Sequence, residues 1–378
     1  MQRFADDLEA RARDVLAEPV MRYLRQGARD GVSTAEATAA WDRFRFLPHV
    51  LRDVSRVDTG TSLLGTAVRS PLAVAPTTMQ RAAHPDGELA MARGAHSAGA
   101  LMVLSSNAGS TFEDVADTGV DWWLQLYVTA DREACRPLLR RAADSGARAV
   151  VLTVDTPVVG TKYDGTDPTV WDLAEPGWLR ANFATGDDGV AGGVAGGVAG
   201  GDKAADLGAR DVEWLAHESG LPVVVKGVLR PDDARHCVEA GADAVWVSNH
   251  GGRQLDGAAP TADCLAGVVD EVGSSTEVYV DGGIRSARHV LAALALGASG
   301  VFLGRLPVYA LAVGGDDGVR RLLAELGDDL TDALRLCGVP SVGAVTADLL
   351  ALPADDTDVV RRPRGTGSPG PRTPSSAP

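Results

Sequence analysis

Short apolar runs separated by amphipathic stretches dominate the chain from residue 72 onward. The runs are continuously apolar, which is typical of strands buried on both faces of a parallel sheet. They cover residues 72–76, 101–105, 123–127, 149–153, 222–226, 244–248, 277–281 and 300–304. Helical patterns that end in glycine lie between most of them, at residues 85–99, 132–146, 231–241, 261–273 and 286–297. Eight such units predict an α/β fold, a (β/α)8 TIM barrel; an open doubly wound sheet is the alternative, which the strand count disfavours.

The remaining segments extend this single predicted barrel domain, residues 1–360. Residues 1–60 form an N-terminal helical extension, with helices over 4–26 and 33–44 and an extended stretch over 47–57. A long insertion, residues 156–221, follows the fourth strand and carries a Val-Ala-Gly-Gly repeat within 189–201. Its glycine content predicts a mobile segment over the barrel mouth, although the repeat itself is better read as passive linker. Residues 361–378, rich in Pro, Ser, Gly and Arg, predict a disordered tail.

Composition narrows the class of protein. The chain has 378 residues and a net charge of −15, which disfavours binding to nucleic acid or to anionic membranes. Its four cysteines form no CxxC pair and its histidines lack metal-ligand spacing, so neither a disulfide framework nor a metal site is expected. No apolar run is long enough to span a bilayer, and the first 18 residues are too charged for a signal peptide. These features predict a cytoplasmic protein with reduced thiols.

Polar residues follow the apolar runs at their carboxyl ends, where the active sites of TIM barrels lie. One buried Lys or Asp is more often part of a structural ion pair, but a coincidence at all eight ends is hard to attribute to structure alone. The residues at these ends are Pro76, Thr77, Ser105, Asn107, Gln125, Tyr127, Thr153, Asp155, Lys226, Ser248, His250, Arg253, Asp281, Gly283, Arg285, Gly304 and Arg305.

The stretch Ser-Asn-His-Gly-Gly-Arg-Gln-Leu-Asp, residues 248–256, carries the most specific candidate chemistry. His250 can accept a proton near neutral pH, and Arg253 supplies a fixed cation with a bidentate fork three residues later. Two intervening glycines allow backbone or ligand to approach closely. This set suits a small hydroxy acid, whereas the alternative is a surface turn with a solvated histidine and arginine.

The last two strand ends resemble a phosphate site. Gly283 exposes a backbone N–H group near a predicted helix N-terminus, and Arg285 and Arg305 add cations. Many phosphorylated substrates and cofactors share this pattern. Gln125, Thr153 and Lys226 are placed to point inward, where they suit the edge of a flat ring with carbonyl and N–H groups.

Several segments together resemble the FMN-dependent 2-hydroxy-acid oxidising family, which includes glycolate oxidase, lactate oxidase and mandelate dehydrogenase. They are APTTMQ from Ala75, AHPDGE from Ala83, QLY from Gln125, LTVDTP from Leu152, VKGV from Val225, SNHGGRQLDG from Ser248, DGGIR from Asp281 and LGR from Leu303. The match runs in order from about Tyr23 to Gly343. It implies a (β/α)8 barrel that holds FMN.

The resemblance implies an active site for 2-hydroxy acids. His250 would take a proton from the substrate as electrons pass to the flavin, and Asp155 would hydrogen-bond His250 and stabilise the imidazolium. Arg253 and Tyr23 would hold the substrate carboxylate, and Tyr127 would lie at the hydroxyl group.

The resemblance also implies how FMN would be held. Lys226 would lie near N1 and O2 of the flavin, where a cation stabilises the reduced ring. The ring would be lined by Pro76, Thr77, Ser105, Gln125, Thr153 and Ser248. The ribityl chain and phosphate would be bound by Asp281, Gly283, Arg285, Gly304 and Arg305.

Two residues depart from the family pattern. Lys162 stands where a second carboxylate-binding arginine is common, so it keeps the charge but loses the fork; alternatively, a shifted loop places it in solvent. Asn107 stands where glycolate oxidase has a tryptophan. The smaller residue would open the pocket for a substrate larger than glycolate.

The predicted activity is therefore oxidation of an (S)-2-hydroxy acid to the 2-oxo acid, with O2 as the first expectation for the electron acceptor and a quinone or protein carrier as the second. A different FMN- or phosphate-binding barrel enzyme would explain the phosphate end but leave His250, Asp155 and Arg253 without a role. A flavin-binding barrel without turnover is the third hypothesis. The resemblance also implies a homo-oligomer, a tetramer.

Overall fold

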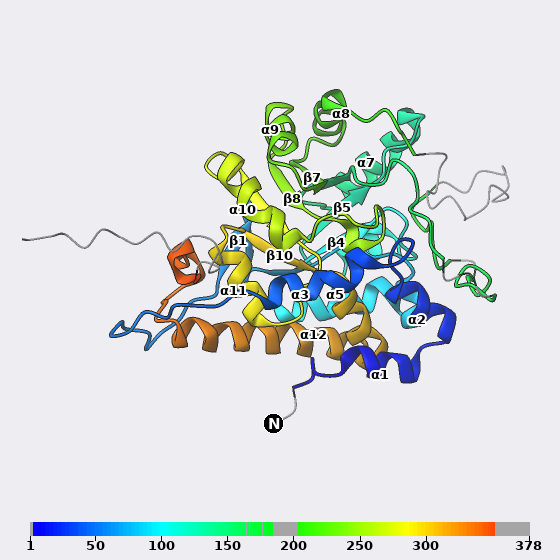
Figure 1. Cartoon of the computed structure of the whole chain (residues 1–378). Coiled ribbons are helices and arrows are strands. Elements are labelled where there is room, and N and C mark those ends of the chain that lie inside the picture. Colours follow the sequence, from blue (N-terminus) through cyan, green and yellow to red (C-terminus); the bar gives the residue numbers. More distant parts are fainter. Residues whose placement is uncertain (1–2, 164, 166, 176, 184–202, 352–378) are drawn as a thin grey trace, which may run out of the picture.

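The computed structural model describes residues 3–163, 165, 167–175, 177–183 and 203–351. Eight parallel strands close into a barrel in the order β10-β3-β4-β5-β6-β7-β8-β9, as predicted (Figure 1). Each predicted strand agrees with an observed one to within two residues at either end. The strands are β3 (Leu72–Val74), β4 (Leu101–Ser105), β5 (Trp122–Leu126), β6 (Val150–Thr153), β7 (Val223–Val228), β8 (Ala244–Val247), β9 (Glu277–Val280) and β10 (Gly300–Leu303).

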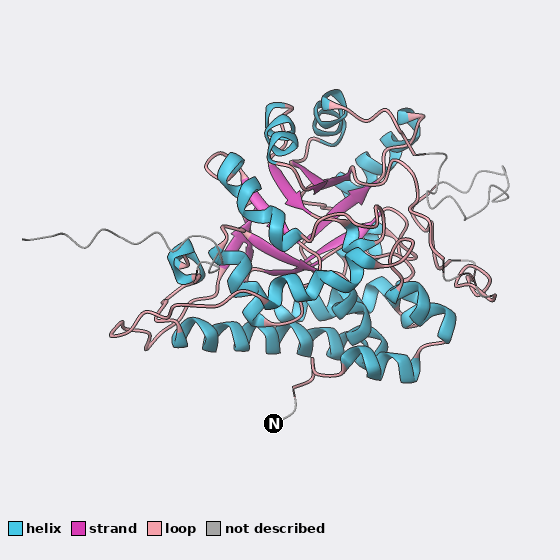
Figure 2. Ribbon diagram, viewed as in Figure 1, coloured by secondary structure: helices cyan, strands magenta, loops and turns pink. Residues whose placement is uncertain are grey.

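Helices surround the barrel, and the strands lie inside them (Figure 2). Those that follow barrel strands are α4 (Gln80–Ala83), α5 (Gly87–Ala98), α6 (Phe112–Ala116), α7 (Arg136–Asp144), α8 (Ala209–Ser219), α9 (Pro231–Glu239), α10 (Thr261–Val272), α11 (Ala287–Ala295) and α12 (Arg305–Leu336). The helices α4, α6, α8 and α12 were not predicted, and α8 replaces the last part of the segment expected to be a mobile insertion, residues 156–221. The long helix α12 is broken at Gly314 and Gly315, where Gly315 has a φ of 58°. Short 3₁₀ turns occupy Arg132–Cys135, His250–Gly252, Val342–Ala344 and Ala347–Leu349.

The N-terminal extension differs from the prediction in one place. The expected helix over residues 4–26 is two helices, α1 (Leu8–Val15) and α2 (Glu18–Arg25), followed by α3 (Val32–Asp42). Pro19 causes the break because it has no N–H to donate to the preceding turn, and it is instead accommodated in the first turn of α2. The break matters because α2 carries Tyr23 on an axis of its own, independent of α1.

Aromatic side chains fill the amino-terminal half of the barrel. Trp123, Trp246, Tyr279 and Phe302 are each at most 1% exposed, and the rings of Trp246 and Phe302 lie 3.9 Å apart between centroids. A hairpin that the sequence analysis missed, β1 (Thr61–Leu63) and β2 (Thr66–Val68), closes this end with the buried side chain of Leu63. Because this half of the barrel is packed solid, space for a ligand remains at the carboxyl ends of the strands.

Both described ends of the long insertion return to the barrel mouth. The N–H of Ala181 donates to the carbonyl of Ala108 over 3.1 Å, and the N–H of Ala204 donates to the carbonyl of Val128 over 2.9 Å. These bonds hold the insertion against the loops that follow β4 and β5. The predicted glycine repeat within 189–201 and the predicted tail at 361–378 lie outside the described residues.

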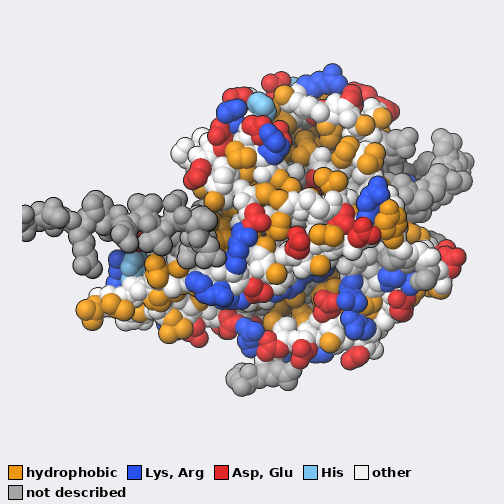
Figure 3. Space-filling view, in the orientation of Figure 1, with side chains coloured by type: hydrophobic (Ala, Val, Ile, Leu, Met, Phe, Trp, Pro, Cys, Tyr) orange, Lys and Arg blue, Asp and Glu red, His pale blue; other side chains and the backbone are white. Residues whose placement is uncertain are grey.

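On the face shown in Figure 3, acidic and basic side chains are intermixed, and no continuous basic area is visible. Among the described residues, no helix is both long and apolar enough to cross a membrane.

Candidate active site

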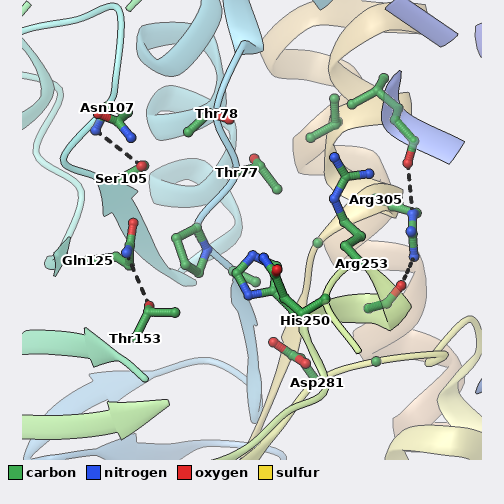
Figure 4. A pocket seen from close by; sticks show the side chains of 18 of the residues that line it. Thr77, Thr78, Ser105, Asn107, Gln125, Thr153, His250, Arg253, Asp281 and Arg305 are labelled. Atoms are coloured by element: carbon green, nitrogen blue, oxygen red, sulfur yellow. Dashed lines mark hydrogen bonds between the residues drawn. The ribbon is translucent and has the colours of Figure 1, made fainter. Parts of the chain in front are cut away.

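A cavity of about 300 Å³ opens at the carboxyl ends of the barrel strands and is partly continuous with solvent. This volume lies within the ordinary range of pockets that bind small ligands. Every predicted site residue except Asp155 and Ser248 lines the cavity, part of which is shown in Figure 4. Asp155 and Ser248 are hydrogen-bonded to the lining residues His250 and Lys226, respectively. The strand-end prediction thus brought together one site from segments throughout the chain.

His250 enters the cavity from a strained turn. It has a φ of 57°, and Gly251 and Gly252 continue in the same left-handed region with φ of 63° and 76°. A side chain at Gly252 would place its Cβ 2.4 Å from Oγ1 of Thr34 in α3. The turn can therefore pass this close to α3 only with glycine, and the unfavourable backbone of His250 is held by the surrounding packing.

Asp155 lies behind His250 and orients its ring. His250 Nδ1 and Asp155 Oδ1 are 2.9 Å apart, and Thr156 Oγ1 donates to the same Oδ1 over 3.0 Å. Burial opposes ionisation of Asp155, but the charge and hydrogen bond of His250, with Lys226, lower its pKa to about 2. Burial also lowers the pKa of His250, and Asp155 opposes that shift. With Nδ1 facing an ionised carboxylate, Nε2 remains as the proton acceptor.

Lys226 belongs to a buried polar chain on the floor of the cavity. Its Nζ donates to Ser248 Oγ over 2.9 Å and lies 3.2 Å from Asp281 Oδ2, and Ser248 Oγ donates to Asp281 Oδ1 over 2.7 Å. Ser248 Oγ also accepts the backbone N–H of His250 over 3.1 Å. One serine hydroxyl therefore couples the position of the lysine to that of the histidine turn.

The wall formed by β4, β5 and β6 offers amide and hydroxyl groups. Gln125 Nε2 donates to Thr153 Oγ1 over 3.1 Å, and Ser105 Oγ accepts the N–H of Asn107 over 3.2 Å (Figure 4). Gln125, Thr153 and Ser105 are at most 4% exposed. Buried hydrogen-bonding groups held in fixed positions suit a flat heterocycle, as the sequence analysis expected.

Arg253 and Tyr23 lie together on the opposite side. The guanidinium carbon of Arg253 is 4.8 Å from the centroid of the Tyr23 ring, and its Nη1 donates to the carbonyls of Tyr23 and Gln26 over 2.8 and 3.0 Å. The hydroxyl of Tyr23 shares a hydrogen bond of 3.0 Å with Thr78 Oγ1. These bonds fix a cation and a phenol beside His250, which suits an α-carboxylate.

Lys162 is neither in solvent nor simply an arginine replacement. Its Nζ donates to the carbonyls of Gly160 and Arg253 over 2.5 and 2.6 Å, and its side chain is partly buried at the cavity wall. The lysine therefore ties the loop after β6 to the loop that carries Arg253. The lysine thus lies at the cavity wall and not in open solvent, while its contact with a substrate carboxylate stays a prediction.

The ends of β9 and β10 form an electropositive recess. Arg285 and Arg305 make no ion pair with any described carboxylate, and burial lowers the pKa of both, that of Arg305 to about 10. The buried hydroxyl of Ser286, at the N-terminus of α11, has no hydrogen-bond partner among the described residues. Buried cations and an orphaned hydroxyl beside a helix N-terminus are the features of an anion site.

Comparison with known proteins identifies the family. The sequence pattern of FMN-dependent dehydrogenases matches residues 12–352. The chain belongs to this family. It is 41% identical over 361 residues to 2-hydroxyacid oxidase 1 of Homo sapiens, across 91% of this chain and 95% of that protein. It is 41% identical over 346 residues to 4-hydroxymandelate oxidase of Amycolatopsis orientalis, across 89% of this chain and 95% of that protein.

A solved structure agrees with the sequence comparison. Mandelate oxidase crystallised with (S)-4-hydroxymandelic acid is 39% identical and superposes with a TM-score of 0.82, across 92% of this chain and 98% of that one. The predicted resemblance to the FMN-dependent family and the predicted barrel are confirmed.

The cavity of this FMN-dependent dehydrogenase fits its cofactor. The recess at Arg285, Ser286 and Arg305 has unneutralised cations and an unpaired hydroxyl for a phosphate. Gly304 would direct a Cβ into open space, whereas a Cβ on Gly283 would lie 2.2 Å from the carbonyl oxygen of Ala37. Gly283 therefore lets the loop after β9 pack directly on α3, and the amide-lined wall at Gln125 would remain for the ring.

The sequence analysis missed the residues that position these loops. Thr38 Oγ1 and Trp41 Nε1 of α3 donate to the carbonyls of Gly283 and Gly282 over 3.0 and 2.8 Å. Because α3 lies more than 200 residues from these glycines, no local pattern reveals the contact. Lys203 and Arg180 of the insertion also line the cavity and were missed.

Composition could have revealed Lys203. The sequence holds three lysines among its 36 basic residues, Lys162, Lys203 and Lys226. All three line this cavity.

Proposed function

We propose that the protein oxidises an (S)-2-hydroxy acid to the 2-oxo acid and that O2 accepts the electrons, giving H2O2. The observation that supports this most strongly is the pair His250 and Asp155, 2.9 Å apart, beside Arg253 and Tyr23 in the family's cavity. The names of the relatives support the same class, since they are oxidases of 2-hydroxy acids and of 4-hydroxymandelate.

The residues divide the work between binding and proton transfer. Arg253 and Tyr23 would bind the substrate carboxylate and so present the 2-hydroxyl group to Nε2 of His250. Nε2 would take the hydroxyl proton, and the ionised carboxylate of Asp155 would stabilise the imidazolium that forms. Tyr127 would lie at the hydroxyl group. Bound FMN supplies the two-electron acceptor for the C2–H bond.

The remaining residues would serve the cofactor. Lys226, held by Ser248 and Asp281, would place its ammonium where negative charge accumulates on the reduced ring. Gln125, Thr153 and Ser105, with the loop of Pro76 and Thr77, would line the ring. Asp281, Gly283, Arg285, Gly304 and Arg305 would bind the ribityl chain and phosphate.

The proposal also covers the size of the substrate, the cellular location, the oligomeric state and the electron acceptor. Asn107, in place of a tryptophan, would admit acids larger than glycolate, including lactate and longer chains.

A cytoplasmic location is supported by the four cysteines, all free thiols. A homo-oligomer, a tetramer, is proposed from the family resemblance, and the exposed side chains of Val50 and Leu51 could contribute to a contact between copies. A quinone or protein acceptor is the alternative to O2.

An anaerobic absorption titration tests the reaction. The purified holoprotein is mixed without oxygen with (S)-lactate, glycolate, (S)-mandelate and longer (S)-2-hydroxy acids. Bleaching of the flavin band by at least one acid, followed by recovery and H2O2 formation on admission of air, is expected. A flavin that no 2-hydroxy acid reduces contradicts the oxidation, and a reduced flavin that air leaves unchanged contradicts O2 as acceptor.

A further inference from the structure

We propose that Lys203 binds a second anionic group of the substrate, so that the enzyme prefers 2-hydroxy acids that carry a distal carboxylate. This inference rests on the proposed oxidation of 2-hydroxy acids, and it names the class within them. Arg180, from the same insertion, lines the same cavity and adds positive charge to that wall.

The choice of lysine over arginine points to the cavity. Of 36 basic residues only three are lysines, and each of them lines this one cavity. Elsewhere the chain meets its need for positive charge with arginine, which suits surface pairs and stacked or bidentate contacts. A compact ammonium is therefore placed at Lys203 for a local purpose, as it is at Lys226 beneath the proposed ring site.

The backbone holds Lys203 at the wall of Tyr127. Residue 203 forms an antiparallel bridge with Thr129, and the next N–H, of Ala204, donates to the carbonyl of Val128 over 2.9 Å. The ammonium of Lys203 consequently lies 3.9 Å from the centroid of the Tyr127 ring. Lys203 is thus attached to the strand end that carries a predicted catalytic residue.

The ammonium of Lys203 has no counterion among the described residues. It makes no ion pair with a described carboxylate, and the only described polar partner of its ammonium is the face of the Tyr127 ring. Burial lowers its pKa to about 8, and the more distant Asp155 only partly opposes this shift. A partly buried cation without an anion is costly, and a bound carboxylate would remove that cost.

The α-carboxylate already has its own partners elsewhere. Arg253 and Tyr23 are stacked on each other beside His250, and Figure 4 shows Asn107 on the other side of His250 from Arg253. Arg180 belongs to the segment that pairs with this second side, since Ala181 donates to Ala108. A substrate anchored at Arg253 would therefore extend toward Asn107, between the two cations of the insertion.

Charge balance favours a dianion. On the substrate side the cavity is lined by Arg253 and Lys203, while Asp155 behind it is committed to His250. A monocarboxylate neutralises one of these two cations, whereas a 2-hydroxydicarboxylate such as malate or 2-hydroxyglutarate neutralises both. The two acids differ by one methylene, so together they report the distance between the carboxylate sites.

The test compares binding of matched 2-oxo products to the oxidised holoenzyme. 2-Oxoglutarate and 2-oxopentanoate have the same chain length and differ in the distal carboxylate, and both are titrated by their perturbation of the flavin absorption. Wild type is expected to bind 2-oxoglutarate about tenfold more tightly. Equal affinity, or tighter binding of 2-oxopentanoate, would overturn the proposal.

Variants assign the preference to Lys203. Lys203→Met keeps the length of the side chain without its charge and is expected to remove the tenfold preference, whereas Lys203→Arg is expected to retain it. Arg210→Met removes an exposed cation of α8 and is the matched control, expected to leave the preference unchanged. Unchanged flavin content shows that each variant is folded. A preference that survives Lys203→Met contradicts the role of this lysine.

Kinetics separate this inference from the function on which it rests. Anaerobic reduction is measured with (S)-2-hydroxyglutarate, (S)-malate and (S)-2-hydroxypentanoate. If neither these acids nor (S)-lactate, glycolate or (S)-mandelate reduce the flavin while the product preference persists, the oxidation is wrong and the dicarboxylate site stands. If all reduce it with equal saturation constants that Lys203→Met leaves unchanged, the oxidation stands and the dicarboxylate site is wrong.

The pH dependence gives an independent signature. The ammonium faces the Tyr127 ring, with Asp155 and Lys162 as the other charged groups that act on it. Because its pKa is about 8, the charge is lost as pH rises through that value, and the preference for 2-oxoglutarate is expected to fall between pH 7 and pH 9. Lys203→Arg is expected to keep its preference over the same range, because guanidinium stays charged.

Discussion

The two halves of the barrel interior are built on opposite principles. At the amino-terminal half, Trp123, Trp246 and Tyr279 pack against one another almost without exposure, and Phe302 packs on Trp246 and also lines the cavity. At the carboxyl half, the same strands end in His250, Lys226 and other polar groups around open space. The comparison teaches that the packed half supplies the stability with which the open half can keep buried charges and a strained turn.

The largest effect should come from His250→Asn, which alters the open half alone. Removing the proton acceptor is expected to lower the anaerobic rate of flavin reduction by about 10³- to 10⁴-fold. The unfolding midpoint should stay near that of wild type, because asparagine tolerates the left-handed backbone at this position. Stopped-flow absorbance and urea unfolding measure the two quantities, and a rate within tenfold of wild type would remove His250 from the mechanism.

Trp123→Ala should act in the opposite sense, on the packed half alone. The side chain is fully buried and does not line the cavity, so its removal leaves a void that is expected to cost about 3–5 kcal/mol of stability. The rate of flavin reduction in the folded fraction is expected to stay within a few-fold of wild type. A variant that unfolds normally but reduces its flavin slowly would break the division between the two halves.

Asp155→Asn separates the role of the carboxylate from that of the base, His250, within the open half. Loss of the carboxylate leaves the imidazolium less stabilised, and flavin reduction is expected to slow by about a hundredfold. Asp155 opposes the burial that lowers the His250 pKa, so the variant should lower that pKa further. The acid limb of the rate profile, where protonation of His250 removes the base, is therefore expected at lower pH than in wild type. A limb shifted to higher pH would contradict this pairing.

The smallest of these effects should appear at the phosphate recess. Arg285→Met removes a cation without a described counterion and is expected to weaken FMN binding to the apoprotein by about tenfold. Riboflavin, which lacks the phosphate, should bind the variant and wild type equally. The exposed Arg288→Met serves as the control. Equal losses for FMN and riboflavin would place Arg285 outside the phosphate site.

Sequence reasoning predicted the features that depend on neighbouring residues in the sequence. It missed the contacts between residues that lie far apart in the sequence. The barrel strands were found because a strand buried on both faces must be continuously apolar. The strand ends then placed His250, Lys226 and Arg285 at one face without any knowledge of their distances. The break at Pro19 had a local signal that the helical periodicity obscured, and the hairpin β1–β2 is too short to show a period.

Contacts between residues far apart in the sequence leave no local sequence pattern. Thr38 and Trp41 hold the loop after β9 by hydrogen bonds to backbone carbonyls, which any residue could offer. Lys162 was expected either to bind a carboxylate or to face solvent, yet its ammonium also donates to two carbonyls, which no sequence pattern specifies. Such contacts depend on the tertiary arrangement, which is why roles assigned from single residues remain predictions here.

Concentration of all three lysines in one cavity also makes the protein unusually simple to label. An amine-selective acylating reagent meets no lysine on the outer surface, so apart from the terminal amine its adducts report the cavity. Lys226 is 4% exposed and paired, whereas Lys203 has a pKa of about 8 and therefore carries some free amine near neutrality. Mass spectrometry of lysine adducts would therefore read the occupancy of this site directly, without any chromophore or turnover.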